Sequence, residues 1–265
     1  MHTHSAASLA LPIDVRLMNF AASVLLAGLS VFGIAALLAW GARQPIFALQ
    51  RIVVQGDVSH SDPLTLRANV APRLRGTFFT LDLAQAKAVF EAQPWVRKAV
   101  VRREFPSQLR VTLQAHQASA YWGAEGEYRL INNFGEVFEA NLDEVEPIDL
   151  PRLSGPEGQG LSVLVMYQTL KPLFDQVDQG LDQVELSGGG LWRVKLDSGA
   201  ELELGRGNAQ ELVPRTTRFL KTFTQAASVY GRSFASLETA DLRYPQGYAM
   251  RLRGVSTAGT NVTQK

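Results

Sequence analysis

The longest feature of the hydrophobic pattern is an uncharged run near the start of the chain. Residues 20–42 contain no charged side chain. In a helix that rises about 1.5 Å per residue they span about 34 Å, and the hydrocarbon core of a bilayer is about 30 Å thick. Arg16 and Arg43 bracket the run, and Trp40 occupies the place of an interfacial aromatic side chain. The pattern therefore predicts a single transmembrane helix.

Two other kinds of segment resemble such a run. A cleaved signal peptide has an apolar region of about 7–15 residues after a basic start, whereas this run is longer and residues 1–15 hold no Lys or Arg. A buried core helix rarely stays uncharged over such a length. Residues 1–19 hold one basic residue, Arg16, and residues 43–62 hold two, Arg43 and Arg51. So small a difference does not decide which side of the membrane holds the rest of the chain.

After this run, residues 43–115 show the pattern of a small α+β domain. β-Branched and alternating segments predict strands, and apolar residues at helical spacing predict helices. Asp82 is the expected N-cap of the second helix. The expected order of elements is strand 52–55, helix 62–70, helix 83–90, strand 96–103 and strand 109–114.

Residues 116–253 have a mostly β pattern with two helices. The clearest hairpin joins residues 192–197 to residues 201–204, because apolar and polar residues alternate on both sides of a Ser-Gly turn. The tail from Gly254 is small and polar, which predicts disorder. The other expected elements are a hairpin at 130–138, a helix at 161–174, a helix at 212–230, and two closing strands at 242–244 and 248–252.

Charge divides the chain near residue 115. Residues 43–115 hold 11 Lys and Arg against 5 Asp and Glu, whereas residues 116–265 hold 14 against 19. This switch favours two domains. The basic one follows the membrane run, where anionic lipid attracts positive charge, although two ordinary solvated surfaces explain the same counts more simply.

Candidate chemistry is sparse. The chain has no Cys, which excludes disulfides and thiolate sites, and a net charge of +1 argues against a chain-wide nucleic-acid surface. His2 and His4 lie in the N-terminal tail, while His60 and His116 stand without a partner motif or metal-ligand spacing. The loop at residues 205–208 lacks the Lys of a phosphate-binding loop. We expect no catalytic, cofactor-binding or metal-binding residue, no small-molecule substrate and no nucleic acid, and hence a binding scaffold rather than an enzyme.

Several motifs together carry a resemblance to a known family. They are Val53-Val54-Gln55-Gly56, Gln93-Pro94-Trp95-Val96, Val101-Arg102-Arg103-Glu104-Phe105-Pro106, Leu109-Arg110-Val111, residues 150–158, the Trp192 strand, Leu204-Gly205-Arg206, and Ala240-Asp241-Leu242-Arg243-Tyr244. From the membrane run to about Arg253, the chain resembles the FtsQ/DivIB family of bacterial cell-division proteins.

The resemblance implies an α+β fold in which a POTRA-like βααββ domain (43–115) precedes a mostly antiparallel β domain with flanking helices (116–253). It also implies a cytoplasmic tail (1–19), an inner-membrane helix within lipid (20–42) and a disordered tail (254–265), with both domains in the periplasm at the division septum. The implied partners are the small coiled-coil proteins FtsB and FtsL and other members of the divisome. The implied role is a non-enzymatic scaffold that links early and late division proteins and controls septal peptidoglycan synthesis.

The last predicted strand is the candidate contact for these partners. A strand at a sheet edge offers free backbone groups to a partner strand, and two nearby tyrosines add aromatic area. Alternation alone does not distinguish an edge strand from a closing core strand; the resemblance favours the edge. The expected partner-binding residues are Arg243, Tyr244, Gly247, Tyr248, Ala249, Met250, Arg251 and Leu252.

Two other classes of protein share parts of this pattern. A POTRA-type module that binds polypeptides in envelope transport would be followed by a barrel of many amphipathic segments, and only a few short strands follow here. A membrane-anchored envelope enzyme would need convergent His, acid or Ser residues, and the sequence shows none.

Overall fold

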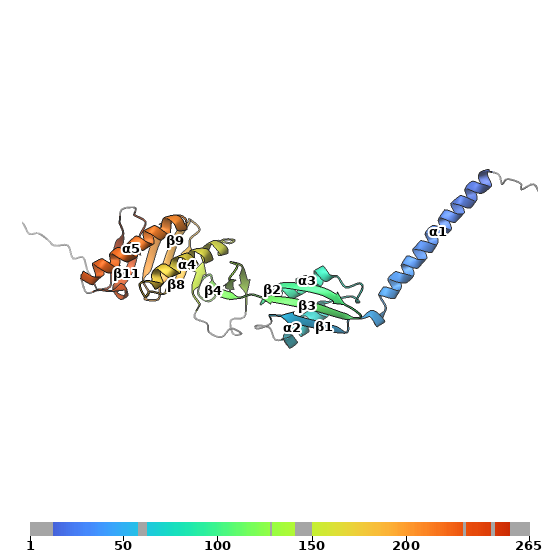
Figure 1. Cartoon of the computed structure of the whole chain (residues 1–265), viewed down its shortest axis with the longest axis horizontal. Helices are drawn as coiled ribbons and strands as arrows, with labels where there is room; N and C mark the ends of the chain where they lie inside the picture. The colour runs from blue at the N-terminus through green and yellow to red at the C-terminus, as the bar shows by residue number, and fades with distance from the viewer. Residues whose placement is uncertain are drawn as a thin grey trace, which may run out of the picture. The chain divides into compact units, whose positions relative to one another are not determined.

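The structure, a computed structural model, describes residues 13–57, 63–127, 129–140, 150–229, 232–244 and 247–254. The predictions for His2, His4, His60 and the tail beyond Gly254 lie outside these residues. The chain divides into two compact units (Figure 1). The first unit comprises Met1–Gln93 and Lys98–Gln114, and the second comprises Pro94–Arg97 and Ala115–Lys265.

Helix α1 covers Ile13–Ala42 and contains the predicted membrane run. Its Leu17–Ala42 portion is long and apolar enough to cross a membrane, and it is the one such helix in the part of the chain that the structure describes. Large side chains are exposed around the helix, as Leu25 (73%) and Phe32 (71%) illustrate. A helix that is apolar on every side and that no other described residue covers suits a lipid environment.

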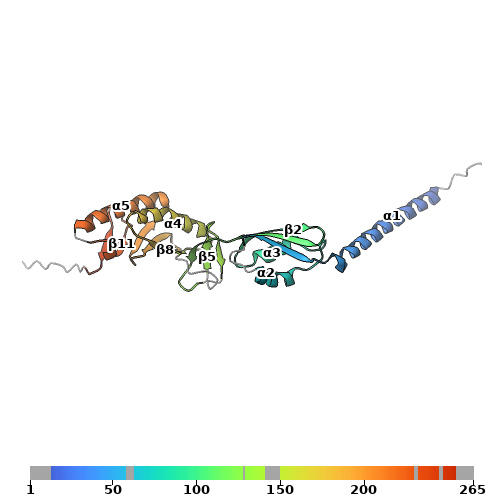
Figure 2. The same cartoon turned by 60° about the horizontal axis from the view of Figure 1, so that its bottom comes forward.

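The folded part of the first unit has the predicted order of elements. Its three-stranded sheet has the order β1-β3-β2, with β1 and β3 parallel, and Figure 2 shows the helices beside it. Asp82 caps α3 as expected, because its Oδ1 accepts hydrogen bonds from the backbone N–H groups of Ala84 and Gln85. The elements are β1 (Arg51–Gly56), α2 (Pro63–Val70), η2 (Ala71–Arg73), α3 (Leu83–Glu91), β2 (Val96–Glu104) and β3 (Gln108–Ala115), with η1 (Pro45–Phe47) before them.

The second unit is built on a nine-stranded sheet in the order β12-β11-β10-β9-β8-β7-β4-β5-β6. Most of the pairs are antiparallel, whereas β4–β7, β7–β8 and β10–β11 are parallel. The strands are β4 (Ala118–Trp122), β5 (Arg129–Asn132), β6 (Val137–Glu139), β7 (Arg152–Ser154), β8 (Leu181–Leu186), β9 (Leu191–Leu196), β10 (Glu201–Arg206), β11 (Leu237–Asp241) and β12 (Ala249–Leu252).

Helices α4 (Gly160–Asp175) and α5 (Ala209–Val229) lie side by side over one face of this sheet (Figure 1, Figure 2). The core forms between them and the apolar positions of the β9–β10 hairpin. The alternation predicted there is confirmed, since Val194, Leu202 and Leu204 are almost completely buried. The polar residues between them therefore face the side of the sheet away from the helices. The α+β fold class, with its mostly antiparallel second sheet, is confirmed.

The closing strands differ from the prediction. Strand β11 spans Leu237–Asp241, not residues 242–244, and is preceded by a short 3₁₀ helix, η4 (Phe234–Ser236). Asp241 ends the strand, because its Oδ1 accepts a hydrogen bond from the backbone N–H of Arg243 in an Asx turn. Leu242 is buried beyond the strand end. The prediction missed this because the Leu-Arg-Tyr alternation at 242–244 imitates a strand.

Candidate functional site

Strand β12 lies at one end of the nine-stranded sheet. It pairs with β11 in antiparallel register, with Ala240 opposite Met250 and Asp241 opposite Ala249, and no other described strand pairs with it. Backbone groups on the outer side of an edge strand are open to another chain. Of the two interpretations left open by the sequence, the structure supports an edge strand.

The side chains of β12 alternate between the two faces of the sheet: Met250, opposite Ala240, and Leu252 lie on the helix-covered face with Tyr248, whereas Ala249 and Arg251 lie on the other face. Tyr248, just before the strand, packs edge-on against Phe219 of α5, with ring centroids 4.9 Å apart, and Leu252 also contacts the core. Met250 is 43% exposed and does not belong to the core. The strand is thus held from one side while much of its side-chain surface stays free.

The far end of β12 is fastened by Arg253. Its backbone N–H donates to the carbonyl of Ser236 at 2.8 Å. Its Nη2 donates to the carbonyl of Ser198, in the β9–β10 turn, at 2.9 Å. These two bonds fix the edge strand to the rest of the sheet, so a partner would meet an ordered surface.

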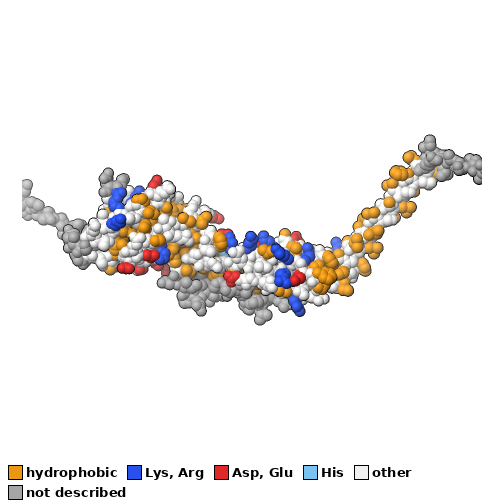
Figure 3. All heavy atoms as spheres, viewed as in Figure 1, with side chains coloured by type: hydrophobic (Ala, Val, Ile, Leu, Met, Phe, Trp, Pro, Cys, Tyr) orange, Lys and Arg blue, Asp and Glu red, His pale blue; other side chains and the backbone are white. Residues whose placement is uncertain are grey.

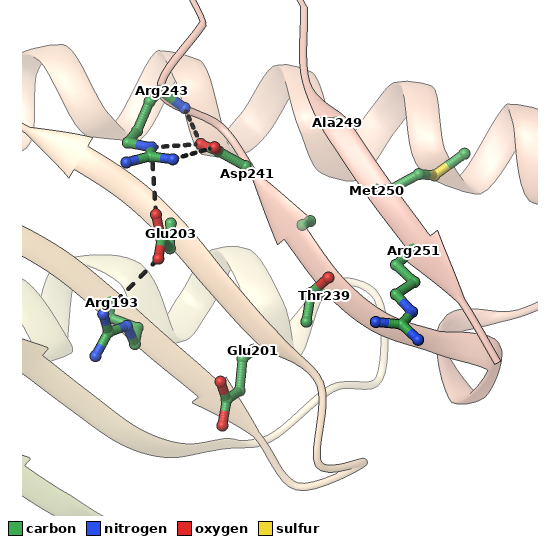
Figure 4. A pocket seen from close by; sticks show the side chains of 10 residues that line it. Arg193, Glu201, Glu203, Thr239, Asp241, Arg243, Ala249, Met250 and Arg251 are labelled. Carbon is green, nitrogen blue, oxygen red and sulfur yellow. Dashed lines mark hydrogen bonds and ion pairs between the residues drawn. The ribbon is translucent and has the colours of Figure 1, made fainter.

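A hollow of about 390 Å³ lies beside β12, on the face of the sheet away from the helices (Figure 4). It runs across β9, β10, β11 and β12, which are neighbours only in the folded sheet. Its lining residues are Arg193, Glu201, Glu203, Thr239, Ala240, Asp241, Arg243, Ala249, Met250 and Arg251.

A chain of ion pairs crosses the hollow, as Figure 4 shows. Arg243 contacts Glu203 of β10 at 3.2 Å and Asp241 at 2.5 Å, and Arg193 contacts the other oxygen of Glu203 at 3.7 Å. The hydrogen bond from Arg243 lowers the pKa of Asp241 below its usual value, and the same contact raises the pKa of Arg243. The site is therefore charged but internally paired, with Arg243 half exposed at its rim.

The remaining predicted residues lie around this hollow in different ways. Tyr244 is 57% exposed just after the Asx turn. An added Cβ at Gly247 would meet no atom within 4 Å, so local packing does not require glycine there. Arg251 projects from β12 and contacts Glu238 at 3.2 Å. Thus the structure gathers Arg243, Ala249, Met250 and Arg251 in the hollow, but turns Tyr248 toward the core.

Six lining residues were absent from the predicted set: Arg193, Glu201, Glu203, Thr239, Ala240 and Asp241. A signal for Glu201 and Glu203 existed, because their alternation with leucines places them on the solvent face of a hairpin. What the sequence did not provide was the neighbour relation between β10, β11 and β12, which is set by the parallel β10–β11 pairing.

His116 and the loop at residues 205–208, which were considered for chemistry, make structural contacts. The ring of His116 stacks on Phe138 at 4.1 Å, and its Nδ1 lies 2.9 Å from the Asn132 side-chain amide. Burial lowers the pKa of His116. The loop at residues 205–208 joins β10 to α5, and Trp192 Nε1 donates to the carbonyl of Gly207 there. No cluster of three metal-ligating side chains occurs within the described ranges.

These features define a class of protein: a chain with one membrane-length helix, a small βααββ unit, and a β unit that presents an open sheet edge. Family models match both units. The model described as "POTRA domain, FtsQ-type" matches residues 47–116, and the model described as "Cell division protein FtsQ/DivIB, C-terminal" matches residues 120–243. Strand β12 follows the end of the second match.

Curated relatives that bear the name cell division protein FtsQ match nearly the whole chain. The relative from Thiomonas arsenitoxydans is 40% identical over 96% of this chain and 93% of its own length. Those from Burkholderia pseudomallei and Bordetella pertussis are 38% and 34% identical, over 91% and 90% of this chain and 94% and 92% of their own. The chain belongs to the FtsQ/DivIB family of cell division proteins, which confirms the resemblance seen in the sequence.

Proposed function

We propose that the chain is a non-enzymatic scaffold of the bacterial division machinery. Helix α1 anchors it in the inner membrane, with residues 1–19 in the cytoplasm and the domains at 43–115 and 116–253 in the periplasm. It acts at the division septum, where it links early and late division proteins. Its family membership and its single membrane-length helix support this proposal, and the same membership disfavours an envelope transporter or an anchored enzyme.

The proposed partners are FtsB and FtsL, whose binding at β12 gives the scaffold its influence on septal peptidoglycan synthesis. The observation that carries this assignment is the open edge of β12 beside a charged hollow. A partner strand added to this edge forms main-chain hydrogen bonds, and its alternate side chains meet the two faces of the sheet. The exposed apolar surface of Tyr244 and Met250 is then covered.

Charge adds selectivity to this mode of binding. Arg243 and Arg251 are 51% and 73% exposed, so a carboxylate on the partner can approach either one. Each arginine already has an internal carboxylate partner, so the expected gain is in orientation and association rate more than in affinity.

The test is co-purification of the full-length chain with co-expressed FtsB and FtsL. Met250→Glu places a charge where the partner strand should lie, and we expect it to reduce recovery of both partners at least tenfold. Val165→Glu is the matched control, because Val165 on α4 is 47% exposed and Met250 is 43% exposed. Wild-type recovery with Met250→Glu, in a protein with an unchanged melting temperature, would remove β12 from the interface.

A further inference from the structure

Large apolar side chains are exposed at one end of the first unit. Ile46 is 76% exposed, Phe79 is 52% exposed and Phe105 is 83% exposed. They come from three segments: η1, the loop before α3, and the turn between β2 and β3. Figure 3 shows hydrophobic side chains gathered on the first unit beside the end of α1. We call Ile46, Phe79 and Phe105 the juxtamembrane rim.

Strand register places these segments at the same end of the sheet. The parallel pairing sets Arg51 of β1 opposite Gln108 of β3, and the backbone N–H of Gln50 donates to the carbonyl of Ser107 at 3.0 Å. The turn that carries Phe105 therefore lies beside the residues between η1 and β1. Exposed Thr112, in contrast, is paired with Gln55 near the opposite end of β3.

The loop that carries Phe79 is fixed to the end of α1. Thr77 Oγ1 donates to the carbonyl of Ala42, the last residue of α1, at 2.6 Å. The backbone N–H of Phe78 donates to the carbonyl of Phe47 at 2.7 Å. The Phe79 ring then packs edge-on against Phe47 at 5.0 Å. Thus the rim is continuous with the point where the membrane helix ends.

Arg103 holds the same loop from the sheet side. Its Nε donates to the carbonyl of Phe78 at 2.6 Å, and its Nη2 donates to the carbonyl of Leu81 at 2.5 Å. The exposure of Phe79 is therefore built into an ordered loop. An ordered loop that keeps a phenylalanine outside the core indicates a surface that meets something apolar.

Arginines lie within a few residues of the rim residues along the chain. Several exposed arginines of the first unit form no salt bridge with a described residue. The nearby carboxylates are occupied, since Glu104 binds Arg110 and Asp82 caps α3. These exposed arginines are Arg43, Arg51, Arg73, Arg75 and Arg102, besides Arg103, which binds the loop carbonyls.

We propose that the juxtamembrane rim docks into the headgroup region of the membrane that α1 crosses, with these arginines on anionic lipid headgroups. The inference rests on the proposed anchoring by α1. Aromatic side chains favour the membrane interface, and basic side chains next to it bind anionic lipid. Continuity with α1 and the unpaired positive charge favour lipid over a protein partner. Docking would hold the first unit against the bilayer surface.

The absence of Cys from the chain makes a direct test possible. Full-length single-cysteine variants Phe79→Cys, Phe105→Cys, Thr112→Cys and Phe32→Cys are labelled with a nitroxide and reconstituted in vesicles of phosphatidylethanolamine and phosphatidylglycerol. Power-saturation electron paramagnetic resonance measures how often each nitroxide collides with oxygen, which concentrates in lipid, and how often it collides with a water-soluble nickel chelate. We expect the oxygen-to-nickel accessibility ratio at positions 79 and 105 to exceed that at 112 at least threefold.

Three results would overturn the proposal, and they are distinguishable. If the oxygen-to-nickel ratios at positions 79 and 105 equal that at 112 while position 32 is exposed to lipid, α1 is in the membrane but the rim does not dock. If position 32 is exposed to water, α1 does not cross the membrane, and both the proposed anchoring and the proposed docking are wrong. Low accessibility to both reagents at 79 and 105 would indicate contact with a second copy of the chain, which is the only protein in the vesicles.

The charge contribution has its own comparison. Arg43→Gln with Arg75→Gln, in the Phe105→Cys background, should lower the ratio at least twofold in anionic vesicles and leave it unchanged in phosphatidylcholine vesicles. Arg206→Gln is the control, because Arg206 is an exposed arginine of the second unit. An unchanged ratio in anionic vesicles would remove the arginines from the docking surface.

Discussion

The two end strands of the nine-stranded sheet differ in how their side chains are used. At one end, Phe138 of β6 is 8% exposed and lies in a cluster with Trp95 and Leu130. At the other end, Met250 of β12 is 43% exposed and outside the core. Strand β6 is thus fixed to the core by the buried ring of Phe138, whereas β12 keeps the apolar side chain of Met250 partly in solvent. The open β12 edge is the surface at which we propose that a partner binds.

Polar interactions reinforce the β6 end. Arg97 forms two hydrogen bonds with Glu136, at 2.6 and 3.0 Å, and is 3.7 Å from the Phe134 ring centroid. The Asn132 amide donates to Glu136 and lies against His116 Nδ1. This geometry makes Nδ1 of His116 an acceptor, which fits a neutral imidazole. At the β12 end, the ion pairs line an open hollow instead.

The largest expected difference between the two ends is in stability. Phe138→Ala should lower the free energy of unfolding by about 3–5 kcal/mol, because it leaves a cavity beside Trp95 and His116. Met250→Ala should lower it by less than about 0.5 kcal/mol, as for other exposed positions. Urea unfolding of the two full-length variants in detergent measures this. Equal losses would show that β12 is as much a part of the core as β6.

A smaller effect separates the two tyrosines next to β12. Tyr248→Glu should reduce partner capture and also lower the free energy of unfolding by about 1–3 kcal/mol, since Tyr248 packs on Phe219. Tyr244→Glu should reduce capture with stability unchanged, because Tyr244 is 57% exposed. Capture and thermal melting are measured on the same preparations. If Tyr248→Glu melts like the wild type, the packing assigned to its ring is wrong.

The smallest expected effect is the pH response of the β6 end. Burial lowers the pKa of His116 in the folded state from its usual 6.5, and the hydrogen bond from Arg97 lowers that of Glu136 from 4.5. In both cases the unfolded chain takes up the proton first, so stability is full above the unfolded pKa and falls as pH drops. The loss should begin near pH 6.5 and steepen below pH 4.5.

His116→Gln provides the matched comparison for this response. The variant keeps an acceptor for Asn132 but does not titrate, so its stability should stay level between pH 7 and pH 5 while the wild type loses stability. Urea midpoints across this range are the measurement. Identical pH profiles would mean that the environment of His116 does not favour its neutral form.

Much of the fold was predictable because it depends on local pattern. The strand, helix, helix, strand, strand order of the first unit and the Asp82 cap follow from periodicity and side-chain chemistry within a few residues. So does the β9–β10 hairpin. Strands β4, β7 and β8 were missed because they are short or lack clear alternation. Strand β7 is three residues long and is defined by its parallel neighbours on both sides.

The candidate site was only half predictable for the same reason. The alternation around Met250 and Arg251 marks a strand, but it says nothing about which strand lies next to it. The hollow exists because β11 returns parallel to β10 and brings Glu203 within reach of Arg243. Such a contact joins residues about forty positions apart, which no local rule specifies.

By itself, the amino-acid sequence determined the membrane-length helix, the two-part α+β organisation and the family. These depend on apolar run length, periodicity and motifs, all of which are properties of neighbouring residues. Only the tertiary structure decided that β12 is an edge, that Tyr248 faces the core, and that Ile46, Phe79 and Phe105 share the end of the first unit next to α1. The physical reason is that exposure and neighbourhood are set by pairing between distant segments.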